Sequence, residues 1–320
     1  HESHAYSAFK PIDFSDPLVV PIDRTGDGVS ATVSVVENNR LKRIQTTYTY
    51  DSPGWFYAAI TYYLGFKIAQ HEGKITGLAA YGDPNKTYGI LKKFLIFSEK
   101  DENFRNVSKT IGQTTINAFK KELNRFSMED ISAGAQKVLE EAVVNFISYF
   151  TKKHNKRNVA LAGGVFGNVK LNQRIKELAQ VDNIYIFPHM GDGGLAAGAA
   201  LAATESKPYK FNQVYWGTDY SESEILEALN KSNLTYKKVE NIEKEIARLL
   251  SKNKIVAVFN GPMEYGPRAL GNRSILYTPI DKSVNDWLNE KLKRCYDEKT
   301  EILTNEGWKF IKNIKNDEIV

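Results

Sequence analysis

The stretch NVALAGGVFGNVKLNQRIKELAQVDNIYIFPHMGDGGLAAGAALAA, residues 158–203, indicates the fold class of this 320-residue chain. Its apolar start, NVALA, predicts a buried strand, and Gly163-Gly164 then makes a turn into a helical pattern over 168–179. The order repeats with the strand-like run NIYIF and the helix-like run GDGGLAAGAALAA. Alternation of strand, glycine turn and helix is typical of an α/β fold. In such folds ligands bind at the carboxyl ends of the strands, where these glycine turns lie.

The sequence before this stretch predicts strands followed by helices. Apolar runs separated by Gly, Asp and Asn turns predict antiparallel strands between residues 17 and 50. Helical spacing of apolar residues predicts helices over 53–70 and 129–154. The stretch 83–128 between them is rich in Lys and Asn and weakly patterned, which is typical of an insertion or a variable subdomain.

The sequence after this stretch predicts a smaller α/β segment. We expect a helix over 221–232, a strand near 234–239, a helix over 241–252, a strand over 255–259 and a helix over 283–294. The length of the chain is that of two domains, at about 150 residues each.

Composition and charge exclude several classes of protein. The net charge of +5 comes mostly from lysines spread along the chain, whereas a nucleic-acid interface would cluster them. The chain has no apolar run of the roughly 20 residues that cross a membrane. A single cysteine excludes a disulfide framework, so we expect a cytoplasmic protein. The chain has neither a signal-peptide pattern nor an initiator methionine, so we expect it to begin partway into a protein.

The segment NGPMEYGPRALGNRSIL, residues 260–276, predicts an anion-binding site. Arg268 and Arg273 lie among three glycines, and Glu264 precedes them. Guanidinium groups bind phosphate and carboxylate through two hydrogen bonds, and glycine lets backbone N–H groups approach an anion. The structural alternative is a glycine-rich surface turn with a salt bridge from Glu264 to one of the arginines.

Two further positions suggest ligand binding, each with a structural alternative. Gly163 and Gly164 place backbone N–H groups at a helix start, which can bind an anion or serve as a packing turn. Asp192, in the first turn of a helix, can ligate a metal or cap the helix. His1 and His4 are three residues apart, whereas metal-binding histidine pairs on helices are usually four apart.

Two loops are weaker candidates for binding. Asp23 is expected to end a strand before the turn of DRTGDG, which could hold phosphate or be an ordinary hairpin. His71, Glu72 and Lys74 are expected on a glycine-flanked loop, where charged residues bind substrate or are simply exposed.

Taken in order, these segments resemble the carbamoyltransferase family that acts on nodulation factors and aminoglycoside antibiotics. Six blocks carry the resemblance: HESHAYSAF (1–9), PIDRTGDG (21–28), YYLGFKIAQHEGKITGLAAYG (62–82), LAGGVFGNVKLNQRI (161–175), FPHMGDGGLAAGAAL (187–201) and FNGPMEYGPRALGNRSIL (259–276). The resemblance implies an actin- and sugar-kinase-like domain, similar to threonylcarbamoyl-transfer proteins, followed by an α/β adenylate-forming domain. It implies that carbamoyl phosphate and ATP give a carbamoyl-adenylate, whose carbamoyl group passes to a hydroxyl acceptor at a metal centre, usually iron.

The resemblance also assigns roles to residues. It implies that His4 and Asp192 are metal ligands at the catalytic centre, with the other family histidine one residue before His1. The residues proposed to bind the nucleotide are Asp23, Gly163, Gly164, Asn168, Arg268 and Arg273. The residues proposed to bind the substrate are His71, Glu72, Lys74 and Glu264. Arg24 departs from the family pattern, in which we expect a small residue after Asp23.

A second resemblance begins at Cys295, the only cysteine of the chain. The run CYDEKTEILTNEGWKFIKNIKNDEIV is similar to the first block of an intein, in which the cysteine thiol attacks the carbonyl of the preceding residue, here Arg294. The alternative is an ordinary buried cysteine before a β-hairpin. The later intein blocks do not follow within the 320 residues.

The sequence therefore predicts three segments. Residues 1–208 would be the actin-like domain without its N-terminal strands, 209–294 a truncated adenylate-forming domain, and 295–320 a short β segment from an intein. Such a fragment is expected to be inactive alone. We expect the complete protein to be a homodimer. The acceptor could be a sugar, an aminoglycoside or a lipid-linked glycan. Two other hypotheses are an actin-like sugar kinase and a protein-splicing precursor.

Overall fold

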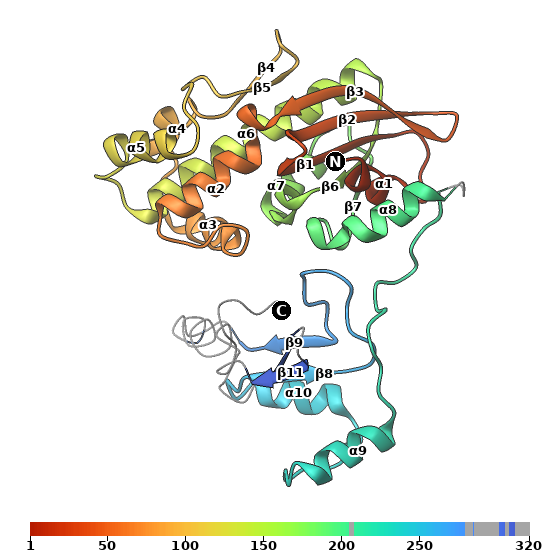
Figure 1. Ribbon diagram of the computed structural model, residues 1–320. Helices are drawn as coiled ribbons and strands as arrows, with labels where there is room; N and C mark the ends of the chain where they lie inside the picture. The colour runs from red at the N-terminus through yellow and green to blue at the C-terminus, as the bar shows by residue number, and fades with distance from the viewer. Residues whose placement is uncertain (205–207, 279–283, 285–300, 305–306, 311–320) are drawn as a thin grey trace. The chain divides into compact units, whose positions relative to one another are not determined.

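A five-stranded mixed sheet lies at the centre of the N-terminal part of the chain (Figure 1). The structure, a computed structural model, describes residues 1–204, 208–278, 284, 301–304 and 307–310. It divides into two units: the first comprises His1–Trp216 and Glu264–Arg268, and the second comprises Gly217–Met263 and Ala269–Val320. The arginine segment is thus divided between the units.

The sheet of the first unit has the order β3-β2-β1-β6-β7. Its strands are β1 (Pro17–Gly26), β2 (Val29–Glu37), β3 (Arg40–Tyr48), β6 (Asn158–Ala162) and β7 (Asn183–Ile186). The first three strands are antiparallel, as expected, and β6 and β7 run parallel to β1. The carboxyl ends of the three parallel strands therefore lie at one edge of the sheet.

Helices cover both faces of this sheet. They are α1 (Glu2–Phe9), α2 (Pro53–Tyr63), α3 (Glu72–Leu78), α4 (Asn85–Leu91), α5 (Gln113–Glu122), α6 (Met128–Lys153), α7 (Val169–Lys176) and α8 (Leu195–Ala203). Short 3-10 turns lie at η1 (Thr49–Asp51), η2 (Ala79–Tyr81), η3 (Gly164–Gly167) and η4 (Asp192–Gly194). The side chains of Ser52, Ser127 and Asn168 cap α2, α6 and α7 by accepting backbone N–H groups.

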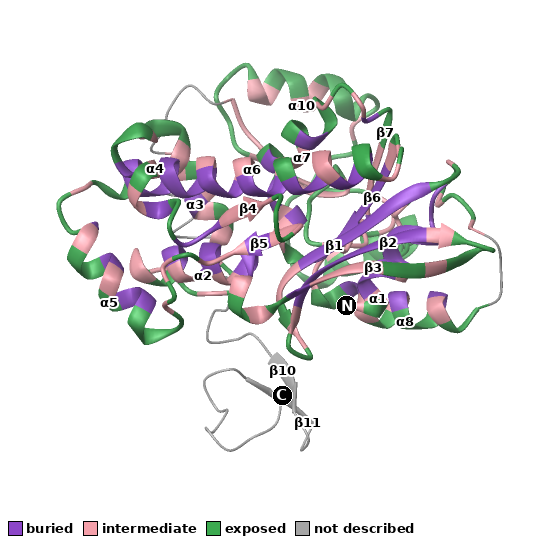
Figure 2. Cartoon of the chain, turned by 90° about the horizontal axis from the view of Figure 1, so that it is seen from above, coloured by how far each residue is buried: buried purple, intermediate pink, exposed green. Residues whose placement is uncertain are grey.

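The alternation of side chains along β1 and β6 builds two cores. Leu18, Val20 and Ile22 point into the larger core, which α2 and α6 cover, whereas Val19 points to the other face. Figure 2 shows the buried residues that run along α6 and these strands. On the second face, β6 presents Ala160. Small side chains there allow α1 to pack closely on the sheet, and α8 packs against α1.

The stretch 83–128 contributes side chains to the main core. It contains α4, α5 and a short hairpin of β4 (Ile96–Ser98) and β5 (Asn103–Arg105). Phe104 and Phe119 are fully buried in the larger core. A few large aromatic side chains, spaced among lysines, anchor this stretch, and its being an insertion or a variable subdomain stays a prediction.

The described elements of the second unit are two helices and two hairpins. They are α9 (Glu222–Lys231), α10 (Ile242–Leu250), β8 (Val256–Phe259), β9 (Arg273–Leu276), β10 (Glu301–Thr304) and β11 (Gly307–Phe310). β8 pairs with β9, and β10 with β11, both antiparallel.

Two expected elements differ from the structure. Residues 234–239 do not form a strand. The helix expected over 53–70 ends at Tyr63, because Gly65 adopts a positive φ of 82° and its N–H bonds back to the last turn. The helix expected over 283–294 lies outside the described residues except at Val284, which is helical.

Candidate active site

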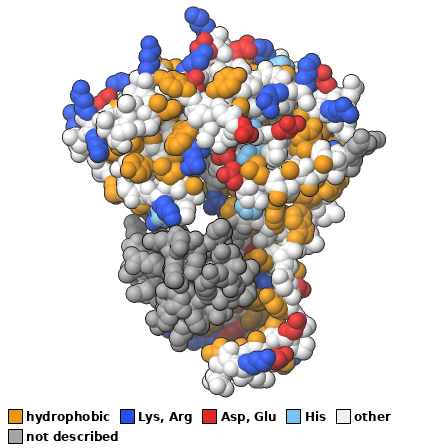
Figure 3. Space-filling view, viewed as in Figure 1, with side chains coloured by type: hydrophobic (Ala, Val, Ile, Leu, Met, Phe, Trp, Pro, Cys, Tyr) orange, Lys and Arg blue, Asp and Glu red, His pale blue; other side chains and the backbone are white. Residues whose placement is uncertain are grey.

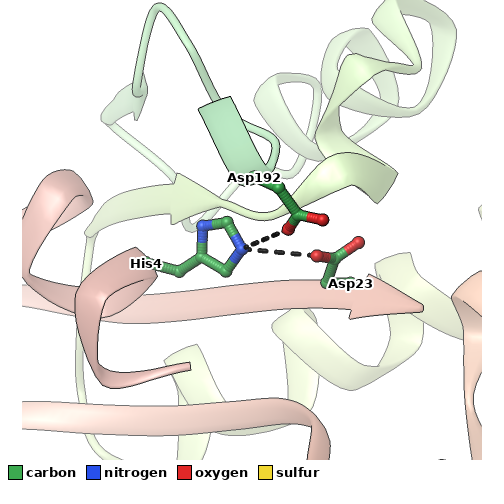
Figure 4. Close-up of side chains that lie close together, drawn as sticks. All are labelled: His4, Asp23 and Asp192. Carbon is green, nitrogen blue, oxygen red and sulfur yellow. Dashed lines mark hydrogen bonds and ion pairs between the residues drawn. The ribbon is translucent and has the colours of Figure 1, made fainter. Parts of the chain in front are cut away.

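Three side chains from separate elements meet at the carboxyl edge of the sheet (Figure 4). His4 comes from α1, Asp23 from β1 and Asp192 from η4. The Nε2 atom of His4 lies 3.3 Å from Oδ2 of Asp23 and 3.7 Å from Oδ1 of Asp192. One ligand atom from each residue lies within 4.8 Å of the others. We call these three residues the His-Asp-Asp cluster.

Asp23 reaches the cluster because β1 is irregular at this point. The parallel pairing of β1 with β6 ends at Pro21, and the antiparallel register with β2 shifts between Ile22 and Gly26. Such irregularities redirect a side chain. The strand continues to Gly26, so Asp23 does not end it, and the hairpin turn lies at Asp27 and the following glycine. This position places Asp23 beside the metal-ligand candidates and removes it from the hairpin turn expected from the sequence.

His4 is held in place by the packing of α1. Its side chain is buried, and its backbone carbonyl accepts a hydrogen bond from Ser7 Oγ at 2.8 Å. His1, at the start of the same helix, directs Nε2 to the backbone carbonyl of Val29, 2.7 Å away. The two histidines therefore do not share one site through these nitrogen atoms.

The electrostatic environments of the two carboxylates differ. Burial by itself raises the pKa of Asp23, but hydrogen bonds from the His4 ring and the Arg24 N–H outweigh it, so the net pKa is lowered. Desolvation by the surrounding groups, together with the Asp23 carboxylate, raises the pKa of Asp192, although its side chain is largely exposed. A cation between the two carboxylates would relieve this repulsion.

The His-Asp-Asp cluster fits a divalent metal ion. Two carboxylate oxygens converge on one imidazole nitrogen, and a single N–H can donate well to only one of them. One imidazole and two carboxylates are suitable ligands for iron or zinc. Within the described residues, this is the group of His, Cys, Asp and Glu side chains whose geometry suits a metal.

A cavity of about 570 Å³ opens beside this cluster, within the first unit. This volume is in the range of small-molecule sites, roughly 300–1,000 Å³. Its lining includes both aspartates, the η3 turn, the first turn of α3 and two arginines: Asp23, Asp192, Gly164, Gly167, Asn168, Glu72, Gly73, Arg24 and Arg268.

A polar network links the helices around the cavity. The Tyr57 hydroxyl donates to Oε1 of Gln136 at 2.7 Å, and Asn168 Nδ2 donates to the same oxygen at 2.8 Å. Gln136 Nε2 donates in turn to Oδ1 of Asn168 at 3.1 Å and to Glu140 at 2.8 Å. Burial raises the pKa of Tyr57, which keeps its hydroxyl protonated as a donor. The network fixes Asn168 at the cavity wall.

Comparison with known families identifies the chain. A family model described as the carbamoyltransferase N-terminus matches residues 1–201, and one described as the carbamoyltransferase C-terminus matches residues 247–297. The chain belongs to the carbamoyltransferase family.

Related proteins match nearly the whole chain. An uncharacterized protein of Methanocaldococcus jannaschii is 37% identical over 311 residues, 92% of this chain and 59% of that protein. Nodulation protein NolNO of Sinorhizobium fredii is 30% identical over 308 residues, 92% of this chain and 45% of its own length. Nodulation protein NolO of Bradyrhizobium diazoefficiens is 30% identical over 308 residues, which are 92% of this chain and 56% of that protein. The chain thus spans about half the length of the relatives it matches.

The glycine turn of this carbamoyltransferase family member lies at the cavity. Gly164 and Asn168 line the cavity, whereas Gly163 packs beneath it. A Cβ atom on Gly163 would lie 2.1 Å from the carbonyl oxygen of Ile22, and its φ is 95°. Gly163 therefore allows close approach of two strands, as the packing alternative proposed.

The residues expected on the loop after α2 are on a helix, since α3 begins at Glu72 and His71 precedes it. Glu72 lines the cavity and accepts the Ala69 N–H at 2.6 Å. In the described structure His71 and Lys74 are not among the lining residues; both lie against the Phe66 ring. Gly73 and Gly77 lie within this helix, although glycine more often indicates a loop.

The residues of the arginine segment do not form one described site. Arg268 lines the cavity and donates to the carbonyl of Gly167. Glu264 is buried and pairs through its backbone with Tyr215. Arg273 belongs to the second unit, where its guanidinium carbon lies 3.5 Å from the centroid of the Phe259 ring. Cys295 lies outside the described residues.

Sequence reasoning missed several residues of the cavity. Arg24, Tyr57, Thr76 and His189 line it, and Gln136 lies just behind it. Arg24 was noticed only as a departure from the family pattern. The others carry no sequence signal, because they are ordinary helix or strand-end residues until the fold brings them together.

Two surface properties bear on the excluded classes of protein. Lys and Arg side chains are scattered over the visible face of the first unit and do not gather in one patch (Figure 3). Among the described helices, none is both long enough and apolar enough to cross a membrane.

Proposed function

We propose that this chain is part of an ATP-dependent O-carbamoyltransferase. The complete protein would form a carbamoyl-adenylate from carbamoyl phosphate and ATP and transfer its carbamoyl group to a hydroxyl acceptor. The observation that carries the proposal is the His-Asp-Asp cluster at the edge of a cavity large enough for such ligands. Family membership supports carbamoyl transfer as the reaction class.

Each described residue has a proposed role in this reaction. His4, Asp23 and Asp192 would hold a divalent ion, which we propose is iron. Such an ion, when bound, supplies Lewis-acid polarisation of a carbonyl oxygen. In the transfer, the acceptor oxygen would bond to the carbamoyl carbon as the bond from that carbon to the adenylate oxygen breaks.

The cavity wall would position the nucleotide and the acceptor. Gly164 exposes backbone next to the cluster, and Asn168 stands at the N-terminus of α7, where an anion is stabilised. Arg268 adds a guanidinium to the same wall. Glu72 is the remaining acidic group of the lining and would accept a hydrogen bond from an acceptor hydroxyl. Arg273 would serve the second unit, whereas Glu264, which belongs to the first unit, would bind substrate.

The test uses the complete protein with ATP, labelled carbamoyl phosphate, Fe²⁺ and a panel of sugars, aminoglycosides and lipid-linked glycans. We expect labelled carbamoyl-adenylate and a labelled carbamoyl ester. Asp23→Asn should abolish the ester while Asp182→Asn, an exposed surface substitution, should keep it. Absence of both labelled products would overturn the proposal. Phosphorylation of the acceptor by ATP without carbamoyl phosphate would identify a sugar kinase instead.

A second proposal concerns the end of the chain. The C-terminal family match ends at residue 297, close to Cys295, and β10 and β11 form a hairpin after it. The end of the family match supports an intein that begins at Cys295, whereas the hairpin fits both an intein and an ordinary cysteine before a β-hairpin. In the complete precursor, Cys295→Ala should stop cleavage after Arg294 as followed by mass spectrometry, and cleavage that persists would contradict the proposal. A cytoplasmic location and a homodimer remain predictions.

A further inference from the structure

Arg24 is an arginine in the cavity wall next to the His-Asp-Asp cluster. It follows Asp23 directly and lines the cavity. Its guanidinium carbon lies 5.2 Å from the centroid of the Trp55 ring on α2, a cation–π distance. Its Nε atom is buried and has no hydrogen-bond partner among the described residues.

The backbone of Arg24 is fixed on several sides. Its N–H donates to Oδ1 of Asp23 at 2.7 Å, and its carbonyl accepts from Ser52 Oγ at 2.7 Å. Gly54 packs so closely that a Cβ atom there would lie 2.5 Å from the Arg24 Cα. The side chain therefore starts from a rigid position, which is how preorganised binding groups are held.

The charges of the cavity favour an anionic ligand. A divalent ion would be balanced by Asp23 and Asp192. The remaining charged side chains of the described lining are Arg24 and Arg268 against Glu72. Glu72 is partly engaged, because one of its oxygens accepts the Ala69 N–H. The charged side chains that remain in the lining therefore carry a net positive charge.

We propose that Arg24, held against Trp55, binds an oxyanion of a small-molecule ligand in the cavity, either a phosphate or a carboxylate. A cation–π contact with the indole does not consume the N–H donors of the guanidinium, which stay available to a two-oxygen group. The inference rests on the proposed function for the position of the ligands. It goes beyond that function by assigning the anion to a residue that departs from the family pattern.

Isothermal titration of the full chain with two matched ligand pairs tests this assignment. AMP and adenosine differ by a phosphate, and glucuronate and glucose differ by a carboxylate. We expect Arg24→Gln to weaken binding of at least one anionic member by about tenfold or more and to leave its neutral partner unchanged. Arg24→Lys should recover part of the loss, because it restores the charge without the fork.

The control is Arg157→Gln, which removes an exposed arginine paired with Asp182 and should leave all four affinities unchanged. A loss confined to AMP identifies a nucleotide phosphate as the partner, and a loss confined to glucuronate identifies an acidic acceptor. The inference is overturned if wild type binds neither anion better than its neutral partner, or if Arg24→Gln weakens the two members of each pair equally. These titrations use no carbamoyl phosphate, so failure of carbamoyl transfer would overturn the proposed function without changing their outcome.

Discussion

At the residue scale, glycine contacts determine where the carboxylate of Asp23 can lie. A Cβ atom on Gly164 would be 2.9 Å from Oδ1 of Asp23, whereas one on Gly167, in the same turn, would meet no described atom within 4 Å. The two glycines thus differ in whether a methyl group disturbs the His-Asp-Asp cluster.

Gly164→Ala should therefore weaken metal binding. Displacing a ligand from its held position typically costs about 10–100-fold in metal affinity. Competition titration of Fe²⁺ or Zn²⁺ with a chromophoric chelator measures the change. Gly167→Ala is the matched control and should bind as wild type does; equal losses in both variants would show that the turn as a whole, and not Oδ1 of Asp23, is responsible.

The buried amide of Gln136 should contribute to stability through its partners. Gln136→Leu removes the acceptor that the Tyr57 hydroxyl and the Asn168 amide share. The Tyr57 hydroxyl keeps Thr76 Oγ1 at 3.0 Å, so the Asn168 amide is the group left unsatisfied, at a cost of about 1–3 kcal/mol. Tyr57→Phe removes only one donor and should cost less. Urea unfolding of both single variants and the double variant gives the coupling energy, and strictly additive losses would argue against a network.

The sequence could predict His4 and Asp192 as metal-ligand candidates and Asp23 as a nucleotide-binding candidate, but not that these three side chains meet. His4 and Asp192 lie in blocks that resemble family motifs, and that resemblance alone implies that they bind the same metal. Asp23 joins them because of an irregularity in β1, and Tyr57 meets Asn168 across separate helices. Such juxtapositions depend on register and helix packing, which residue spacing along one element does not specify.

At the element scale, the contact between α1 and α8 controls the placement of His4. A Cβ atom on Gly198 of α8 would lie 2.1 Å from the backbone oxygen of Ser3 on α1. The helices can approach this closely only with glycine at that position.

Gly198→Ala should therefore shift α1 and reduce both stability and metal affinity. Overpacking of this kind typically costs about 1–3 kcal/mol. Gly89→Ala in α4 is the control, because its Cβ would meet no described atom within 4 Å and alanine favours helix by about 0.5–1 kcal/mol. Thermal unfolding and the chelator titration follow both variants, and a Gly198→Ala protein with unchanged metal affinity would contradict the prediction.

Elements with strong periodicity were confirmed, and weakly patterned ones were not. The long helix expected over 129–154 is observed as α6, and the strand NVALA is β6. The elements not predicted within 83–128 and the strand wrongly expected at 234–239 have a common physical reason. Short elements are specified by the few side chains that tertiary packing buries, and local pattern carries little of that information.

At the scale of the whole molecule, surface carboxylates should make stability fall in acid. Hydrogen bonds from Arg105 and Ser98 hold the pKa of Asp101 at about 2, below its ordinary 3.8. In the second unit a hydrogen bond from Arg248 holds the pKa of Glu245 at about 2, below 4.5. Because the folded state prefers the ionised carboxylates, this stabilisation is present above the ordinary pKa and is lost as pH falls toward 2.

Asp101→Asn should thus be less stable than wild type near neutral pH, and the difference should shrink as pH falls from about 4 to 2. Arg105→Gln removes the main partner of Asp101 and should likewise weaken the dependence of stability on pH between about 4 and 2. Urea unfolding at several pH values measures it, and high salt should reduce the effect because these side chains are partly exposed. A difference that stays constant down to pH 2 would exclude the ion pair as its cause.

The ligands of the proposed metal centre come from opposite ends of the first unit's main stretch, His4 near its start and Asp192 after β7. A loop of almost the whole unit must close before these side chains meet, and contacts of such long sequence separation form late and slowly in folding. The rate at which a refolding chain binds the metal should therefore report when the sheet is complete. This rate would follow the final docking of α1, whereas circular dichroism would record the earlier growth of α6.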